Sequence, residues 1–244
     1  MRDVGTMAEP VIPLAPNVYR IPTMRFDLVN SFALVDDDGS VTLVDTGLSS
    51  APARILAGLA AIGKTPADVQ RIILTHAHAD HAGGAAEMAR LTGRDPELHS
   101  ADAGCAGTGL APPVDASVLS GRLYRRATAG RRAFAPFGVG GTFGDGELLG
   151  VAGGLRVVHT PGHSPGHVSL LHEPSGVLIV GDALFNVLKL RLPLLTFCSD
   201  IALTRRSAHR LADLEYSTAA FMHGPEVSER ARERVRGYLG TVAE

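Results

Sequence analysis

Residues 72–84 have the sequence IILTHAHADHAGG. The apolar start predicts a buried strand, and the small residues at the end lead into a helix expected over 85–91. Successive side chains alternate along an extended backbone, so His76 and His78 point the same way and can bind one ion. Asp80 and His81 face elsewhere and can serve a second ion close by. The stretch therefore predicts a metal site at a strand-to-helix turn.

The alternative for this stretch is a polar loop that binds no metal. Four imidazole and carboxylate groups within six residues are costly to assemble, unless metal charge offsets the loss of their hydration. The density of the cluster therefore favours metal binding.

Composition limits the classes of protein to consider. The chain has 244 residues, of which 45% are hydrophobic and 20% charged, as in an ordinary globular protein. The formal net charge of −2 argues against a general binder of nucleic acids or anionic membranes. Two cysteines, Cys105 and Cys198, cannot form a disulfide framework, so a reduced, cytoplasmic setting is the default expectation.

The N-terminal region offers no targeting signal that we can identify. Prolines at 10, 13 and 16 interrupt it, so it lacks the apolar segment of a signal peptide, and no apolar run in the sequence is long enough to span a bilayer. Either Met1 or Met7 could be the natural start. We expect residues 1–17 to be an extension and residues 18–244 to form a single domain.

The remaining pattern alternates strands and helices, which predicts an α/β architecture with sheets packed against helices. Residues 101–145 are the least regular part, and we expect them to form a lid or insertion that covers or borders the site. The strands are expected over 18–21, 31–35, 41–44, 69–75, 96–99, 155–159, 168–171, 177–180 and 218–222, and further helices over 51–62, 200–214 and 226–239.

Two stretches allow both structural and functional interpretations. Residues 122–132 contain five arginines and are followed by Phe134 and Phe137; the solvated face of a helix is favoured, with an anionic substrate or nucleic acid as the alternative. Residues 184–198 are unusually apolar and could be core or the wall of a hydrophobic pocket. The sequence does not identify substrate-binding residues.

Five aspartate or histidine positions each lie where an apolar strand gives way to a Gly or Pro turn. Strand ends along one sheet edge are common places for sites, so we expect these side chains to converge. His159 and His167 flank His163 and are more typical of packing residues, with a role beside the ligands as the alternative. The five positions are Asp45, His76, His163, Asp182 and His223.

These residues resemble the metallo-β-lactamase superfamily from about residue 18 to the last helix. His76, His78, Asp80 and His81 match its HxHxDH motif, and the other four positions, Asp45, His163, Asp182 and His223, match its remaining motifs. The resemblance implies a four-layer αββα sandwich of two mixed β-sheets faced by helices. It also implies that His76, His78 and His163 hold one ion. Asp80, His81 and His223 hold the other, Asp182 bridges them, and Asp45 orients the histidine loop.

The ligand types leave the metal open. Imidazole and carboxylate without thiolate suit zinc, which we expect first, but also iron or manganese. Two ions about 3.5–4 Å apart can share a water and hold it as a bridging hydroxide that attacks a carbonyl carbon. Asp80 could orient this nucleophile or pass on its proton, so Asp80 and Asp182 are the catalytic candidates.

Asp182 favours the branches of the superfamily that resemble glyoxalase II and lactonases. Only one helix is expected after His223, whereas typical glyoxalase II has a separate helical domain there. The leading hypothesis is a dinuclear hydrolase of a small ester, thioester or lactone with an apolar portion. The alternatives are an oxidoreductase with a single iron, resembling persulfide dioxygenases, and, less favoured, a metal-dependent nuclease. The expected partner is a small-molecule substrate, with no nucleic acid and no membrane, and the oligomeric state stays open.

Overall fold

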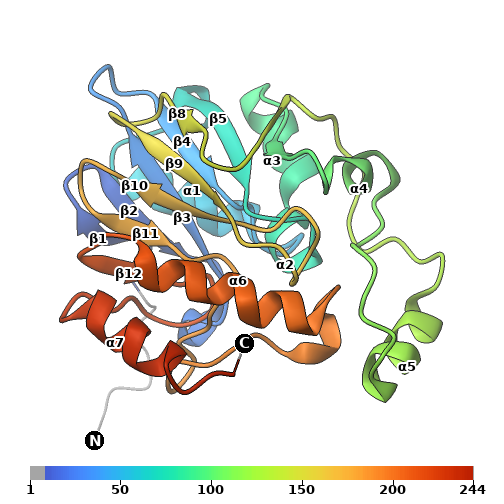
Figure 1. Ribbon diagram of the computed structural model, residues 1–244. Coiled ribbons are helices and arrows are strands. Elements are labelled where there is room, and N and C mark those ends of the chain that lie inside the picture. The colour runs from blue at the N-terminus through green and yellow to red at the C-terminus, as the bar shows by residue number, and fades with distance from the viewer. Residues whose placement is uncertain (1–8, 244) are drawn as a thin grey trace, which may run out of the picture.

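The histidine-rich turn lies beside the first of two mixed β-sheets in the computed structural model, which describes residues 9–243 (Figure 1). This sheet has seven strands in their sequence order. Neighbouring strands from β1 to β4 are antiparallel, and neighbouring strands from β4 to β7 are parallel. The strands are β1 (Ile12–Ala15), β2 (Val18–Pro22), β3 (Asn30–Val35), β4 (Val41–Val44), β5 (Val69–Leu74), β6 (Glu97–His99) and β7 (Gly141–Phe143).

The second sheet has five strands in the order β12-β11-β10-β9-β8. The β11–β12 pair is parallel and the other pairs are antiparallel. The strands are β8 (Leu148–Leu149), β9 (Leu155–His159), β10 (Val168–His172), β11 (Val177–Ile179) and β12 (Thr218–Ala220).

Helices cover the outer faces of both sheets (Figure 1). The α-helices are α1 (Pro52–Ala61), α2 (Ala79–Ala82), α3 (Ala85–Thr92), α4 (Ala103–Thr108), α5 (Leu119–Thr128), α6 (Ile201–Asp213) and α7 (Ala231–Leu239). Three short 3-10 helices are η1 (Arg25–Asp27), η2 (Pro66–Asp68) and η3 (Leu195–Phe197). None of the helices in residues 9–243 combines the length and apolar character needed to cross a bilayer.

Three apolar cores separate four layers, and each follows from the sequence pattern of the strands. Strands buried on both faces are nearly continuous apolar runs, as in β5, where Ile72 and Leu74 face the helices and Ile73 faces the other sheet. The third core lies between the second sheet and α6 and α7. The predicted αββα sandwich of two mixed sheets is therefore confirmed.

Several element boundaries differ from the sequence-based expectations. Residues 12–15, in the expected N-terminal extension, form β1 and pair with β2, while residues 1–8 lie outside the described part. Residues 101–145 contribute α4, α5 and β7, and two of their three phenylalanines, Phe134 and Phe137, pack into the first core. The last helix begins at Ala231 instead of 226, because Val227 forms a bridge with Ala219 and its backbone is extended.

Candidate metal centre

The turn after β5 presents the HxHxDH residues at one end of the first sheet. β5 ends at Leu74, His76 and His78 follow in non-helical backbone, and α2 begins at Ala79. Because a helix turns by about 100° per residue, the adjacent Asp80 and His81 diverge inside α2. His76 and His81 are fully buried, and Asp80 is partly exposed. One turn therefore delivers side chains to two neighbouring positions.

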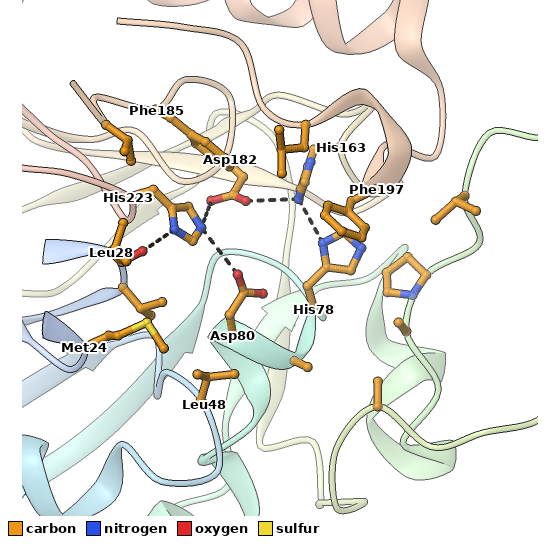
Figure 2. Close-up of a pocket in the computed structure, with 18 of the residues that line it drawn as sticks. Met24, Leu28, Leu48, His78, Asp80, His163, Asp182, Phe185, Phe197 and His223 are labelled. Atoms are coloured by element: carbon orange, nitrogen blue, oxygen red, sulfur yellow. Dashed lines mark hydrogen bonds and ion pairs between the residues drawn. The ribbon is translucent and has the colours of Figure 1, made fainter. Parts of the chain in front are cut away.

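Three ligand candidates reach this turn from the second sheet (Figure 2). His163 follows β9, Asp182 follows β11, and His223 follows β12. The Asp182 carboxylate lies 3.1 Å from His163 Nε2 through Oδ2 and 3.2 Å from His223 Nε2 through Oδ1. His163 Nε2 also lies 2.8 Å from His78 Nδ1. The two sheets thus each supply part of one cluster.

The seven predicted ligands form overlapping groups with the spacing of metal sites, and we call them the ligand cluster. Within each group the ligand atoms lie within 4.8 Å of one another. Asp182 lies between the two triads and touches His163 of the first and His81 and His223 of the second. The groups are His76, His78 and His163; His76, His81 and Asp182; and Asp80, His81 and His223.

Unpartnered polar atoms at the centre of the cluster show that these residues fit a metal. Within the described residues, His81 Nε2, Asp182 Oδ1 and His223 Nε2 are buried without a hydrogen-bond partner. Each such atom costs about 1–3 kcal/mol unless another group satisfies it. Asp182 Oδ1 lies 3.3 Å from His81 Nε2 and 3.2 Å from His223 Nε2, so one cation bound there can satisfy all three atoms.

A hydrogen bond to Nδ1, on the side of the ring away from the cluster, orients His81 and His223. Asp45 accepts from the Thr75 amide and hydroxyl at 2.7 and 2.6 Å, and its Oδ2 lies 2.7 Å from His81 Nδ1. His223 Nδ1 donates to the Leu28 carbonyl at 2.6 Å. These contacts place a proton on Nδ1 and leave Nε2 of both rings free for a metal. Asp45 thus lies where the resemblance implied.

Asp102 is a further orienting residue that no motif in the sequence indicated. Its buried carboxylate accepts from the Ala77 amide at 3.1 Å, the Ser164 hydroxyl at 2.6 Å and the Gly166 amide at 2.7 Å. These bonds join the loop of His76 and His78 to the loop of His163. Asp102 lies three residues after the end of a three-residue strand in an irregular stretch, so the only local signal was an acidic residue in the turn after a strand.

His167 positions the central aspartate, whereas His159 does not. His167 Nδ1 donates to the Thr160 carbonyl at 2.9 Å, and its Nε2 accepts from the Asp182 amide at 2.6 Å. Burial, together with the neighbouring His163, lowers the pKa of His167 to about 3, so the ring is neutral. A side chain at Gly181 would clash with this ring, since a Cβ there would lie 2.5 Å from His167 Nε2. His159 instead stacks on His99, with ring centroids 4.0 Å apart.

Charge in the cluster is balanced between carboxylate and imidazoles. Burial alone would raise the pKa of Asp182, but His223, His81 and His163 outweigh it and hold that pKa well below its usual value. Burial would lower the pKa of His163, yet Asp182 outweighs it and raises this pKa to about 9. Burial and adjacent histidines lower the pKa of His76 and His78. An anionic Asp182 among neutral imidazoles is the form that binds cations.

An apolar cavity of about 540 Å³ opens onto the cluster (Figure 2). His78, Asp80, His163, Asp182 and His223 form its polar end. Residues 184–198 were expected to be either core or pocket wall, and they are both. Leu184 packs in the third core, while other members of the segment line the cavity. The apolar walls include Met24, Leu28, Leu48, Val114, Tyr124, Phe185, Val187, Leu194 and Phe197.

Comparison with known proteins identifies the family. The model of the metallo-beta-lactamase superfamily matches residues 24–223, a span that contains the whole ligand cluster. The chain belongs to the metallo-beta-lactamase superfamily. It is a metal-dependent hydrolase, and the sequence-based assignment is confirmed.

Relatives within the superfamily differ in how much of their length the chain spans. An uncharacterized protein, YobT, of Bacillus subtilis is 28% identical over 223 residues, which are 83% of this chain and 88% of YobT. A hydroxyacylglutathione hydrolase of Anaeromyxobacter dehalogenans is 36% identical over 66% of this chain but only 48% of its own length. The chain thus spans about half of that hydrolase. The crystal structure of a metallo-beta-lactamase family protein, TTHA1429, from Thermus thermophilus is 31% identical with a TM-score of 0.72, covering 93% of this chain and 80% of that one.

Proposed function

We propose that the ligand cluster holds two divalent metal ions, with zinc as the expected metal, and that the protein hydrolyses a small ester, thioester or lactone with an apolar portion. The observation that carries the proposal is the set of unpartnered atoms of His81, Asp182 and His223, in which Asp182 Oδ1 faces both histidine nitrogens at the polar end of a cavity with apolar walls. The neutral and anionic donors suit divalent ions of borderline softness.

Each ion has three candidate ligands besides Asp182, whose two oxygens face different triads. His76, His78 and His163 would hold one ion, and Asp80, His81 and His223 the other. When bound, such ions supply Lewis acidity that polarises a carbonyl oxygen and makes a water more acidic. Positioning the attacking water and the substrate would depend on the side chains of this chain.

Asp80 is the residue best placed to handle the nucleophile. It lines the cavity, is partly exposed, and its Oδ2 lies 3.5 Å from His223 Nε2. A carboxylate there can accept a hydrogen bond from a water and direct the oxygen of that water toward a carbonyl carbon. His78 and His163 border the same polar end from the other side. No serine or cysteine nucleophile is needed, and Cys198 is buried behind His163 with Sγ 3.7 Å from Nδ1.

The cavity walls set the expected substrate. Phe185, Leu194 and Phe197 line the cavity, and an acyl chain buried against them gains about 0.8 kcal/mol per methylene. The names of the hydroxyacylglutathione hydrolases support a thioester among the candidates, although the chain spans only half of those relatives.

The test measures how zinc-loaded protein hydrolyses thioesters, esters and acyl-substituted lactones. Within each class, one substrate carries an acetyl group and its match carries an octanoyl group. We expect hydrolysis that a chelator abolishes and zinc restores, with kcat/KM higher for the longer acyl group. The matched controls are His76→Ala and Asp182→Ala, which remove one histidine ligand and the shared carboxylate. Full activity in a metal-free protein that carries both substitutions would contradict the proposal.

A further inference from the structure

The mouth of the apolar cavity lies in a surface that carries most of the exposed apolar side chains and a third of the basic residues. Three segments form this surface, which we call the mouth face: residues 24–28, 116–132 and 184–198. Each contributes residues to the cavity wall, such as Leu28, Tyr124 and Val187. The same segments also carry side chains that the cavity does not use.

The unused apolar side chains of the mouth face are strongly exposed. Phe26 is 80% exposed, Leu188 is fully exposed, and Leu119 and Leu123 are 63% and 60% exposed. Phe26 lies between two residues that line the cavity, and Leu188 follows directly after another. Exposed apolar side chains gathered on one surface mark an interaction site rather than ordinary scatter.

Helix α5 shows which way this surface faces. Its inner side is anchored by Tyr124, whose ring packs edge-on against Phe197 at 5.1 Å, and by Ser120, which accepts a hydrogen bond from Thr196. Leu119 and Leu123 are one turn apart on a neighbouring side of the helix, about 100° round from Ser120 and Tyr124, and both are more than half exposed. The helix lies at the edge of the molecule (Figure 1). Its apolar stripe therefore serves something larger than a ligand enclosed in the cavity.

Basic residues surround these apolar side chains. The mouth face contains eight of the 23 basic residues of the chain but only one of its 25 acidic residues, Asp27, which pairs with buried Arg20 at 2.9 Å. The eight basic side chains are exposed, and within residues 9–243 none forms an ion pair. They are Arg25, Arg122, Arg125, Arg126, Arg131, Arg132, Lys189 and Arg191. A net charge of −2 for the whole chain therefore conceals a strongly positive surface.

We propose that the mouth face docks on the surface of an anionic lipid membrane, with Phe26, Leu119, Leu123 and Leu188 inserted at the headgroup level and the basic residues against the headgroups. Apolar side chains bordered by arginine and lysine are the pattern of interfacial binding. The proposal replaces the expectation, drawn from net charge, that no membrane is involved. The docking proposal does not depend on the reaction proposed for the cavity, because vesicle binding is measured without substrate hydrolysis.

Two other occupants fit the surface less well. In a symmetric dimer the same patch would face itself and bring two sets of unpaired cations together. A nucleic acid would match the charge, but outward-facing leucines offer neither hydrogen bonds nor stacking to bases. An anionic lipid surface satisfies both the charge and the apolar side chains.

The test is co-sedimentation of the zinc-loaded full chain with vesicles of phosphatidylcholine alone or of phosphatidylcholine and phosphatidylglycerol at 7:3. We expect binding to the mixed vesicles, weakened by salt, and little binding to phosphatidylcholine alone. The double variant Leu119→Ser/Leu123→Ser should lose at least about tenfold in partitioning. Arg125→Gln/Arg126→Gln should lose about fivefold for each arginine removed.

Matched controls carry equivalent changes outside the mouth face. Leu148→Ser removes a half-exposed leucine on β8, and Arg234→Gln/Arg236→Gln removes two exposed arginines on α7. Both should bind like the wild type. The proposal is overturned if the wild type fails to bind anionic vesicles at low salt, or if the controls lose as much as the mouth-face variants. It is also overturned if Leu119→Ser/Leu123→Ser dissociates a dimer in lipid-free sedimentation, or if the protein binds single-stranded RNA more tightly than vesicles.

Discussion

The ligand cluster and the mouth face adjoin each other but are built in opposite ways. In the cluster, ligands are fixed by a second contact, as His81 is by Asp45 and His223 by the Leu28 carbonyl. On the mouth face, side chains such as Leu188 and Lys189 are exposed. The buried side chains are held by partners inside the protein, as a site for chemistry requires, whereas the exposed side chains have few such partners and are available to the proposed membrane surface.

The largest effect should come from breaking the cluster at its shared residue. Asp182→Asn removes the negative charge that faces both triads, and several kcal/mol of lost charge stabilisation correspond to about a thousandfold in rate. We expect kcat/KM for a thioester to fall by at least that factor, with no loss of vesicle binding. If the substitution left kcat/KM within tenfold of the wild type, the cluster would not be the site of hydrolysis.

A smaller effect should follow from loosening the contacts around the cluster. Asp45→Asn keeps the size of the side chain but weakens the acceptor for His81 and Thr75. Loss of such an orienting partner typically costs 10–100-fold in metal affinity. Competition with a chromophoric chelator would measure this change. The exposed Asp38→Asn is the matched control, and equal zinc affinity in both variants would show that Asp45 does not orient a ligand.

The pH dependence of zinc binding separates the buried cluster from the exposed mouth face. His163 has a pKa of about 9 in the metal-free protein, because Asp182 outweighs the effect of burial, so it carries a proton at pH 7. A metal needs the neutral ring, and each ion that binds there must displace that proton. Asp182 also outweighs burial at His81 and His223 and raises the pKa of both, so more than one proton can be displaced. Apparent zinc affinity should therefore rise at least about tenfold per pH unit from pH 7 toward 9. Affinity that is flat over this range would contradict the account, and vesicle binding by the arginines should not follow this profile.

The smallest effect should appear at the boundary between the two regions. Phe197 lines the cavity and packs on Tyr124, so Phe197→Ala should raise KM for an octanoyl thioester about tenfold while leaving an acetyl thioester nearly unchanged. Leu148→Ala, outside the cavity, is the control. An equal loss for both substrates would indicate that Phe197 supports the fold rather than the acyl chain.

The same contrast explains what the sequence could predict. Several residues of the candidate site could be predicted because they follow apolar strands. Periodicity places three candidate ligands, His163, Asp182 and His223, after strand ends, and Asp45 after β4. Tertiary packing then brings them together as expected. The fold followed from the same strands, whose apolar runs match the three cores.

Residues outside this pattern were less predictable for physical reasons. Asp102 acts through backbone amides of distant loops, and a single carboxylate carries no spacing signal for such contacts. His167 looked like a packing residue, and only its contact with the Asp182 amide shows its positioning role. The five arginines of residues 122–132 were visible in the sequence, but their position beside Arg25, Lys189 and Arg191 was not, because the three segments are far apart in the sequence.

Elemental analysis of the purified protein, expressed without added metal, tests the central claim most directly. The account predicts about two zinc ions per chain in the wild type and a clear loss in Asp182→Asn, with hydrolysis following the zinc content. A single iron per chain, with oxygen consumed in the presence of a glutathione persulfide and no thioester hydrolysis, would contradict it.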